Sequence, residues 1–295
     1  MQIECDLGAT VSLYVDYLRK HFPDHHRPFS TRMISAPESA RAEAALFTFL
    51  REHCTKVEPH EIPGLGGVDF ICTTDDYQFL VEVTALEEDS VARASGWSKE
   101  VPAEGGAFSF ENVTAKIRQK VSNKAAQFRD SPLPRILVIA TSHHAGNVLL
   151  GRYAAQASLL SDTSITIPVD NPTGHSSLTT DLQESVFIRP EQGRIVPCRQ
   201  SISALLFVAL HGNECSAIGA LHPEPAKPFD TEGLPNVPFA RFTQWPPSSN
   251  RLSVEWIVSS PKPATHQYRI FDFDLPESLF GTAPTAVNET AVTPE

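Results

Sequence analysis

A single acidic residue interrupts an apolar run that is otherwise typical of a buried β-strand. The run Phe79-Leu-Val-Glu-Val-Thr-Ala-Leu carries Glu82 at its centre. Its β-branched and aromatic residues favour a strand. An isolated ionised carboxylate in a buried strand is costly unless it has a partner. The run therefore limits the fold to one in which a sheet buries this strand and another group compensates Glu82.

The chain on either side of this run predicts an α/β fold. Apolar residues at helical spacing indicate a helix between Ser35 and Cys54, and extended segments follow at residues 57–62 and 68–73. A second helix is expected from about Phe110 to Arg129. The apolar run Ile136-Leu-Val-Ile-Ala is typical of a strand that is buried on both faces. The predicted order is αβββαβ, with a mixed central sheet.

Four segments are expected along the chain. Residues 1–34 form a helical preface, with a helix from Val11 to His21 and a polar turn from His21 to Pro28, and residues 35–165 form the core. Sixteen of the 24 prolines lie from Pro168 onward, so a loop-rich extension at 166–280 packs on the core sheet or extends it. The tail, 281–295, is expected to be disordered. Beyond the core sheet, the sequence predicts a helix at 147–160 and strands at 202–210, 217–221, 252–258 and 267–273.

Charge and composition exclude several classes of protein. The net charge of −11 has the wrong sign for a protein that binds nucleic acid over its whole surface, so any such site must be local. The five cysteines have no CxxC spacing, which argues against a zinc ribbon and favours reduced, mostly buried thiols. The N-terminus lacks the charge pattern of a signal peptide, and no apolar run is long enough to span a membrane, so a cytoplasmic location is expected.

A symmetric hairpin would place a second acid opposite Glu82. If the turn is centred on Asp75 and Asp76, then Thr74 faces Tyr77 and Asp69 faces Glu82. Two ionised carboxylates about 5 Å apart would repel by roughly 3 kcal/mol at an effective dielectric near 20. Mg²⁺ commonly binds one or two carboxylates together with phosphate oxygens, and a shared proton is the alternative compensation. A shift of one residue in the register would separate the two acids.

These residues together resemble the PD-(D/E)XK superfamily of restriction-endonuclease-like nucleases. The resemblance covers about a third of the chain, from Glu38 to His143, and includes Gly-Gly-Val-Asp69 and, thirteen residues later, Glu82-Val-Thr84. It implies a restriction-endonuclease-like fold in which Asp69 and Glu82 bind Mg²⁺ or Mn²⁺ and nucleic acid is hydrolysed. Glu43 resembles the accessory acid that some members add to the metal site.

Two positions depart from the family pattern. Val68 replaces the motif proline, and Thr84 occupies the position of the motif lysine. In similar members that lack this lysine, a lysine of the following helix takes its place. The sequence offers Lys116, Lys120 and Lys124, which recur every four residues along one helix face. Lys120 is the first choice for the catalytic lysine and Lys116 the second, while Lys124, Gln127 and Thr84 are expected to contact substrate.

The leading hypothesis is a divalent-metal-dependent nuclease acting on nucleic acid, with DNA favoured over RNA. Two alternatives remain open. One is a catalytically inactive PD-(D/E)XK-like module that binds protein or nucleic acid, which the acidic charge and the absent motif lysine favour. The other is an unrelated α/β ligand-binding protein, which would be supported if the carboxylates of Asp69 and Glu82 pointed to opposite faces of the sheet.

Overall fold

The computed structural model describes residues 2–4, 6–61, 67–75, 77–99, 109–127, 131–161, 163–166, 177–180, 182–212, 214–247, 251–259 and 270–274. The helices are α1 (Leu7–His21), α2 (Pro23–Ser35), α3 (Pro37–Arg51), α4 (Glu88–Ser95), α5 (Phe110–Gln127), α6 (Gly146–Leu149) and α7 (Arg152–Leu160). The strands of the first half are β1 (Gln2–Glu4), β2 (Lys56–Pro59), β3 (Phe70–Thr73), β4 (Gln78–Ala85) and β5 (Arg135–Thr141). Those of the second half are β6 (Thr163–Thr166), β7 (Ser177–Thr180), β8 (Ile188–Glu191), β9 (Arg194–Pro197), β10 (Ala204–His211), β11 (Glu214–Leu221), β12 (Pro238–Phe242), β13 (Arg251–Val258) and β14 (Ile270–Asp274).

The fold is α/β with a mixed sheet. Its strand order is β2-β3-β4-β5-β10-β11-β12-β13-β14-β7-β6, with β1 paired to β11 and the hairpin β8-β9 apart from it. The central strands β4, β5 and β10 run parallel, whereas β3 is antiparallel to β4 and β11 is antiparallel to β10. Strands of the second half therefore continue the sheet that contains β4.

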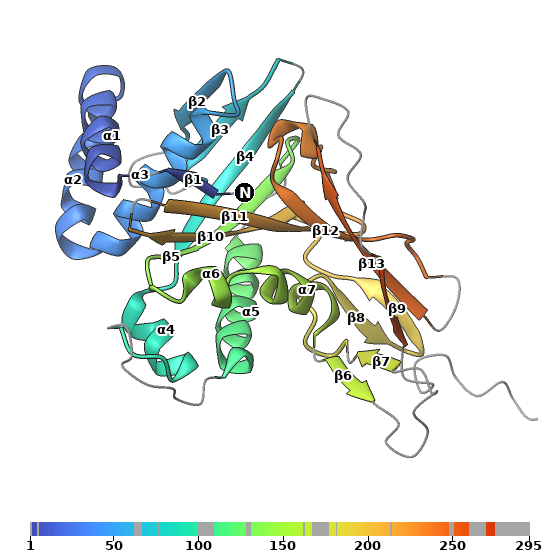
Figure 1. Ribbon diagram of the computed structural model, residues 1–295. Coiled ribbons are helices and arrows are strands. Elements are labelled where there is room, and N and C mark those ends of the chain that lie inside the picture. The colour runs from blue at the N-terminus through green and yellow to red at the C-terminus, as the bar shows by residue number, and fades with distance from the viewer. Residues whose placement is uncertain are drawn as a thin grey trace, which may run out of the picture.

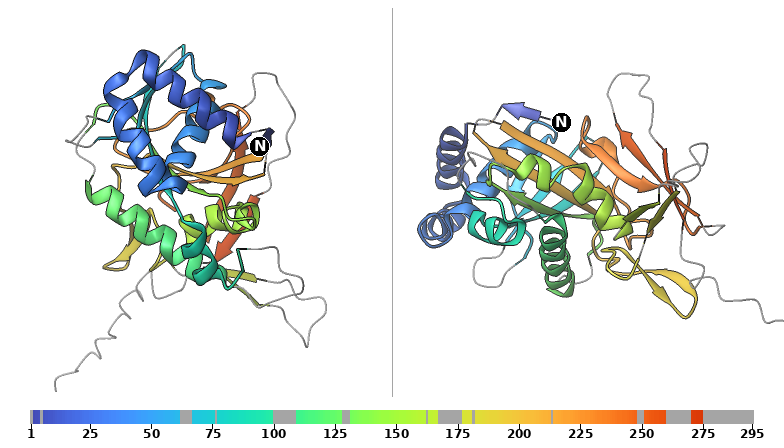
Figure 2. Two further views of the ribbon diagram at one scale, coloured as in Figure 1. Left: turned by 90° about the vertical axis from the view of Figure 1, so that its left-hand side faces the viewer. Right: turned by 60° about the horizontal axis from the view of Figure 1, so that its bottom comes forward.

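Helices cover both faces of this sheet. Figure 1 shows α1, α2 and α3 grouped beside β2, β3 and β4, and α5, α6 and α7 gathered below the sheet. The two views of Figure 2 keep these groups apart. One apolar core joins α1–α3 to Phe70, Val81 and Val83, and a second joins α5 and α7 to Leu137 and Ile139. The alternation of side chains along β5 thus supplies both cores, whereas the apolar side chains of β4 in these cores all belong to the first.

The N-terminal preface contains two helices, which corrects the predicted turn from His21 to Pro28. The helix predicted from Val11 to His21 is confirmed within α1, but Pro23 begins a second helix, α2, that continues through Pro28. Proline is well suited to a first helical position, where its missing N–H costs nothing. Pro28 lies inside this helix. The next residue, Phe29, is fully buried, and its ring centroid lies 4.9 Å from that of Tyr14. Tertiary packing outweighs the local cost of the proline.

Elsewhere, the predicted elements are largely confirmed, with two corrections. The helix predicted at 147–160 is broken into α6 and α7 at Gly151, where an added Cβ would lie 2.6 Å from the carbonyl oxygen of Asn147. Between β4 and α5 the chain also forms α4, a helix that was not predicted; the Glu88 N–H in its first turn donates to Glu38 Oε2 of α3 at 2.7 Å. The four strands predicted in the second half correspond to β10, β11, β13 and β14. The predicted disordered tail, 281–295, lies outside the described residues.

Gly219 provides a test of how tightly the sheet is packed in its second half. It pairs with Phe239 between β11 and β12, and a Cβ at Gly219 would lie 2.3 Å from the Phe239 ring. Because Phe239 is fully buried, Gly219→Ala is expected to lower the free energy of unfolding by about 1 to 3 kcal/mol. Urea denaturation measures this. Gly8→Ala, whose Cβ would have one ordinary contact at 3.4 Å, is the control and should change stability by less than about 0.5 kcal/mol.

Candidate carboxylate site between the sheet and the N-terminal helices

The hairpin that joins β3 to β4 has the predicted register. Phe70 pairs with Val81 and Thr73 with Gln78, and the Thr74 N–H donates to the Tyr77 carbonyl oxygen at 2.9 Å. Asp69 directly precedes Phe70, the first residue of this ladder. Glu82 directly follows Val81, the partner of Phe70. Asp76, in the turn, lies outside the described residues.

Glu82 faces helix α5 and is paired with Lys124. It is 4% exposed, and its neighbour on β5 is Leu137, which belongs to the core beneath α5. Lys124 Nζ donates a hydrogen bond to Glu82 Oε1 and forms an ion pair with it. The other oxygen, Glu82 Oε2, is buried and receives no hydrogen bond from any described group. One of the two carboxylate oxygens of Glu82 therefore has no hydrogen-bond donor among the described groups.

Asp69 points to the side of the sheet that α1, α2 and α3 cover. Its Oδ2 accepts a hydrogen bond of 2.6 Å from the Val83 N–H. Its side chain also lines a cavity of about 120 Å³. The cavity is lined by Tyr14, Leu18, His25, Pro28, Arg32, Glu43, Pro59, Glu61 and Asp69. This volume is smaller than the roughly 300 to 1,000 Å³ of a typical ligand pocket, so the cavity does not accept a nucleotide as it stands.

Glu43, on α3, is held by two groups from the preceding helices. Tyr14 Oη donates to Glu43 Oε1 at 3.0 Å, and Arg32 Nη2 forms an ion pair with Glu43 Oε2 at 2.7 Å. Arg32 Nη1 also lies 3.9 Å from Glu61 Oε2. His25 anchors the same region, because its Nε2 is 2.7 Å from the carbonyl oxygen of Glu61.

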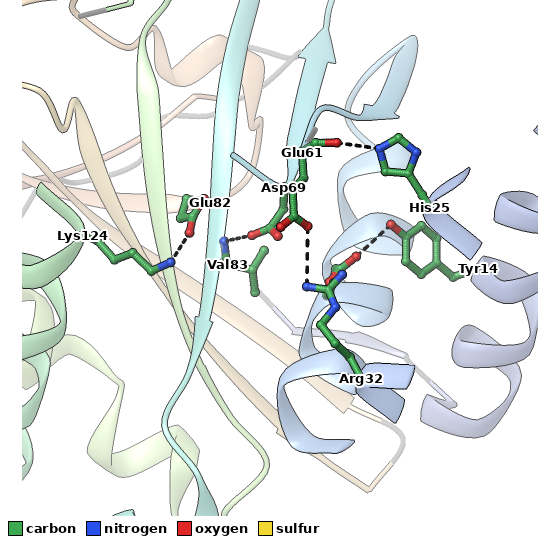
Figure 3. A network of polar contacts seen from close by, with 9 residues as sticks. Tyr14, His25, Arg32, Glu61, Asp69, Glu82, Val83 and Lys124 are labelled. Carbon is green, nitrogen blue, oxygen red and sulfur yellow. Dashed lines mark hydrogen bonds and ion pairs between the residues drawn. The ribbon is translucent and has the colours of Figure 1, made fainter. Parts of the chain in front are cut away.

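The two motif acids lie on opposite sides of β4. Figure 3 shows Glu82 with Lys124 on the side of α5, and Asp69 on the side of Arg32 and Tyr14. Within the described part of the chain, no three His, Cys, Asp or Glu side chains are arranged to hold a metal ion, so Asp69, Glu82 and Glu43 do not converge in this conformation. The divergence of the acids is the observation that favours an unrelated α/β ligand-binding protein, although the register of the hairpin is the predicted one.

The acids are nevertheless close enough to influence one another. Burial raises the pKa of Glu43 to about 7, against the opposing effects of Arg32 and Tyr14. Burial, followed by the charges of Glu43 and Glu82, raises the pKa of Asp69 well above its usual range. Burial also raises the pKa of Glu82, although Lys124 opposes it. The cations present thus do not fully offset the burial of these carboxylates.

The other predicted site residues are distributed along α5 and β4. Lys124 contacts Glu82, whereas Lys120 is exposed and Lys116 partly buried, and neither forms an ion pair with a described residue. Gln127 is exposed at the end of α5. Thr84 is buried and, two residues beyond Glu82, shares its face of β4.

The sequence analysis did not identify Tyr14, His25, Arg32 or Glu61. Three of them come from the two helices of the preface, and Arg32 lies on the helix that was read in part as a turn. The available signal was Pro23 followed by Phe29 and Met33 at a spacing of four, which indicates a helix that buries one face. That reading would have placed Arg32 beside the buried stripe.

No protein-family model, no curated protein and no solved structure matches this chain. Among the described residues, no helix combines the length and hydropathy that a membrane span requires.

Proposed function

We propose that this protein is a divalent-metal-dependent nuclease with a restriction-endonuclease-like core. The observation that carries the proposal is the pair between Glu82 and Lys124. Thr84 stands where the family has its lysine, and the resemblance implies that a lysine of the following helix replaces it. Lys124 is on that helix and reaches the motif acid on β4.

The chemistry of the donor set fits Mg²⁺ or Mn²⁺. Asp69, Glu82 and Glu43 supply oxygen ligands only, which is the set that hard divalent cations prefer. Glu82 Oε2 is buried without a hydrogen-bond donor among the described groups, and the pKa values of the three carboxylates are raised, so an additional positive charge would stabilise their ionised forms. These three side chains are the proposed ligands, and because they do not converge in this conformation, metal binding requires that they rearrange.

Each protein group has a role in this proposal. When bound, the cation supplies positive charge that lowers the pKa of water and neutralises phosphate. The Lys124 ammonium positions the attacking water or the scissile phosphate beside Glu82. Thr84 and Gln127 contact the substrate, and DNA is favoured over RNA. The contact with nucleic acid is local, because the net charge of −11 disfavours binding over the whole surface.

A cleavage assay tests the proposal. Plasmid DNA, single-stranded DNA and RNA are incubated with the protein in MgCl₂ or MnCl₂, and Glu82→Gln and Lys124→Met are each expected to lower the cleavage rate at least tenfold. Asn123→Ala, an exposed neighbour on α5, is the control and should retain the native rate. The proposal is wrong if the native protein cleaves none of these substrates or if both site variants keep its full rate.

A second candidate is a catalytically inactive module of the same fold that binds protein or nucleic acid. The specific observation in its favour is that protein cations already occupy the carboxylates: Arg32 pairs with Glu43, and Lys124 pairs with Glu82. Absence of cleavage of every substrate, with protein cations still holding the carboxylates and no Mn²⁺ bound, would select this candidate over the nuclease.

A further inference from the structure

Arg32 is inserted among the carboxylates of the candidate site. Its guanidinium contacts Glu43 at 2.7 Å and lies 3.9 Å from Glu61, and it lines the same cavity as Asp69. The Arg32 side chain is 35% exposed, while that of Glu43 is 8% exposed. The guanidinium of Arg32, on α2, thus lies beside Glu43 and Asp69, which are two of the three proposed metal ligands.

The electrostatic environment favours the guanidinium in this position. Burial alone would lower the pKa of Arg32, but the charges of Glu43, Asp69 and Glu61 outweigh it and raise that pKa. Reciprocally, Arg32 lowers the pKa values of Glu43 and Asp69 relative to what burial would impose. A cation that stabilises ionised carboxylates competes with any other cation for them.

The helix that carries Arg32 also closes the site. Tyr14 of α1 and Phe29 of α2 are fully buried against each other, and His25 is joined to Glu61. Figure 3 shows Arg32 and Tyr14 on the same side of β4 as Asp69, and both side chains contact Glu43. A phosphodiester could reach Asp69 only if α2 moved, since the cavity there measures about 120 Å³.

We propose that Arg32 is an autoinhibitory internal cation: it occupies the acidic ligands in place of the divalent metal, and α2 must release it before metal and substrate can bind. This inference rests on the proposed metal site of the nuclease. Glu43, one of the proposed ligands, is bound to Arg32 in this conformation, while Glu82, on the other side of β4, is bound to Lys124. Helix α2 is the element that changes position.

Direct metal binding tests the inference without relying on cleavage. The affinity for Mn²⁺ is measured by titration calorimetry on the native protein, Arg32→Gln and Arg27→Gln. Arg32→Gln is expected to lower the dissociation constant at least tenfold. Arg27 is exposed on the same helix, and it has no ion pair with any residue in the described ranges, so its variant should match the native protein.

A second measurement uses only the native protein, so it remains informative if Arg32→Gln folds poorly. Amide hydrogen exchange in α2 is expected to accelerate when MnCl₂ is added, while exchange in α7 stays constant. Equal Mn²⁺ affinities for native protein and Arg32→Gln, or slower exchange in α2, would overturn the autoinhibitory role and leave the nuclease proposal standing. Tighter binding by Arg32→Gln without cleavage would support the role of Arg32 and reject the nuclease. Absence of Mn²⁺ binding in every variant would reject both.

Discussion

The free energy of unfolding, measured in EDTA, is expected to fall as pH rises from 5 to 8, and Glu43→Gln is expected to remove about 3 kcal/mol of that fall. The pKa of Glu43 is raised by burial from 4.5 to about 7 in the folded protein. Between these two values the folded state retains a proton that the unfolded state has lost. Stability due to this group is therefore complete below pH 4.5 and is lost as pH rises through about 7.

The same argument applies with the same sign to Asp69 and Glu82, whose pKa values are also raised by burial. The fall in the free energy of unfolding that remains in the Glu43→Gln variant should come from Asp69 and Glu82. Urea denaturation at pH 5 and pH 8 gives the two free energies for each protein. Glu52→Gln, an exposed acid just beyond the end of α3, is the matched control and should show the native pH dependence.

An increase in native stability between pH 5 and pH 8 would contradict this account. It would mean that Arg32 and Tyr14 compensate Glu43 fully and that the carboxylate is ionised throughout. Such a site would have little tendency to bind a further cation. The pH profile therefore also bears on the metal proposal, since only under-compensated carboxylates gain from Mg²⁺.

Sequence alone predicted the hairpin register because two independent constraints agree on it. The alternation of β4 assigns Val81 and Val83 to one core and Glu82 to the other face, and a turn of fixed length then determines which residue of β3 is opposite. The direction of the Asp69 side chain was not predictable from this pattern. Asp69 lies outside the regular ladder, and its orientation depends on the Val83 N–H and on helices far away in the sequence.

The identity of the lysine could have been predicted from helical geometry. Successive residues of an α-helix turn by about 100°, so Lys124 points within about 20° of both Val113 and Ile117, which are buried. By the same count Lys120 lies about 20° and Lys116 about 60° on the other side of Val113 from Ile117, so Lys124 is nearest the middle of the buried stripe. The ion pair with Glu82 places the last turn of α5 beside the middle of β4.

The role of Arg32 could not be predicted in this way. Its contacts with Glu43 and Glu61 join α2 to α3 and to the segment after β2, and no periodicity in the sequence links these positions. Local signals also pointed away from a helix at Pro28. Only the burial of Phe29 against α1 makes α2 favourable, and this is a property of the assembled fold.

At pH 8, Lys124→Met is expected to lower the free energy of unfolding by about 2 to 3 kcal/mol. The substitution keeps the aliphatic stem but leaves Glu82, which is 4% exposed, without its cation and hydrogen-bond donor. Because Glu82 Oε2 has no donor among the described groups, neither oxygen of the carboxylate would then have a hydrogen-bond donor there. The loss should be smaller at pH 5, where Glu82, with its raised pKa, takes up a proton more readily.

Adding Glu82→Gln to Lys124→Met separates electrostatic pairing from packing. The double variant should be more stable at pH 8 than Lys124→Met alone, since it removes the unpaired charge. Lys120→Met, on the exposed part of the same helix, should change stability by less than about 0.5 kcal/mol. Equal losses for Lys120→Met and Lys124→Met would show that Lys124 does not compensate Glu82, and the observation that carries the nuclease proposal would then be lost.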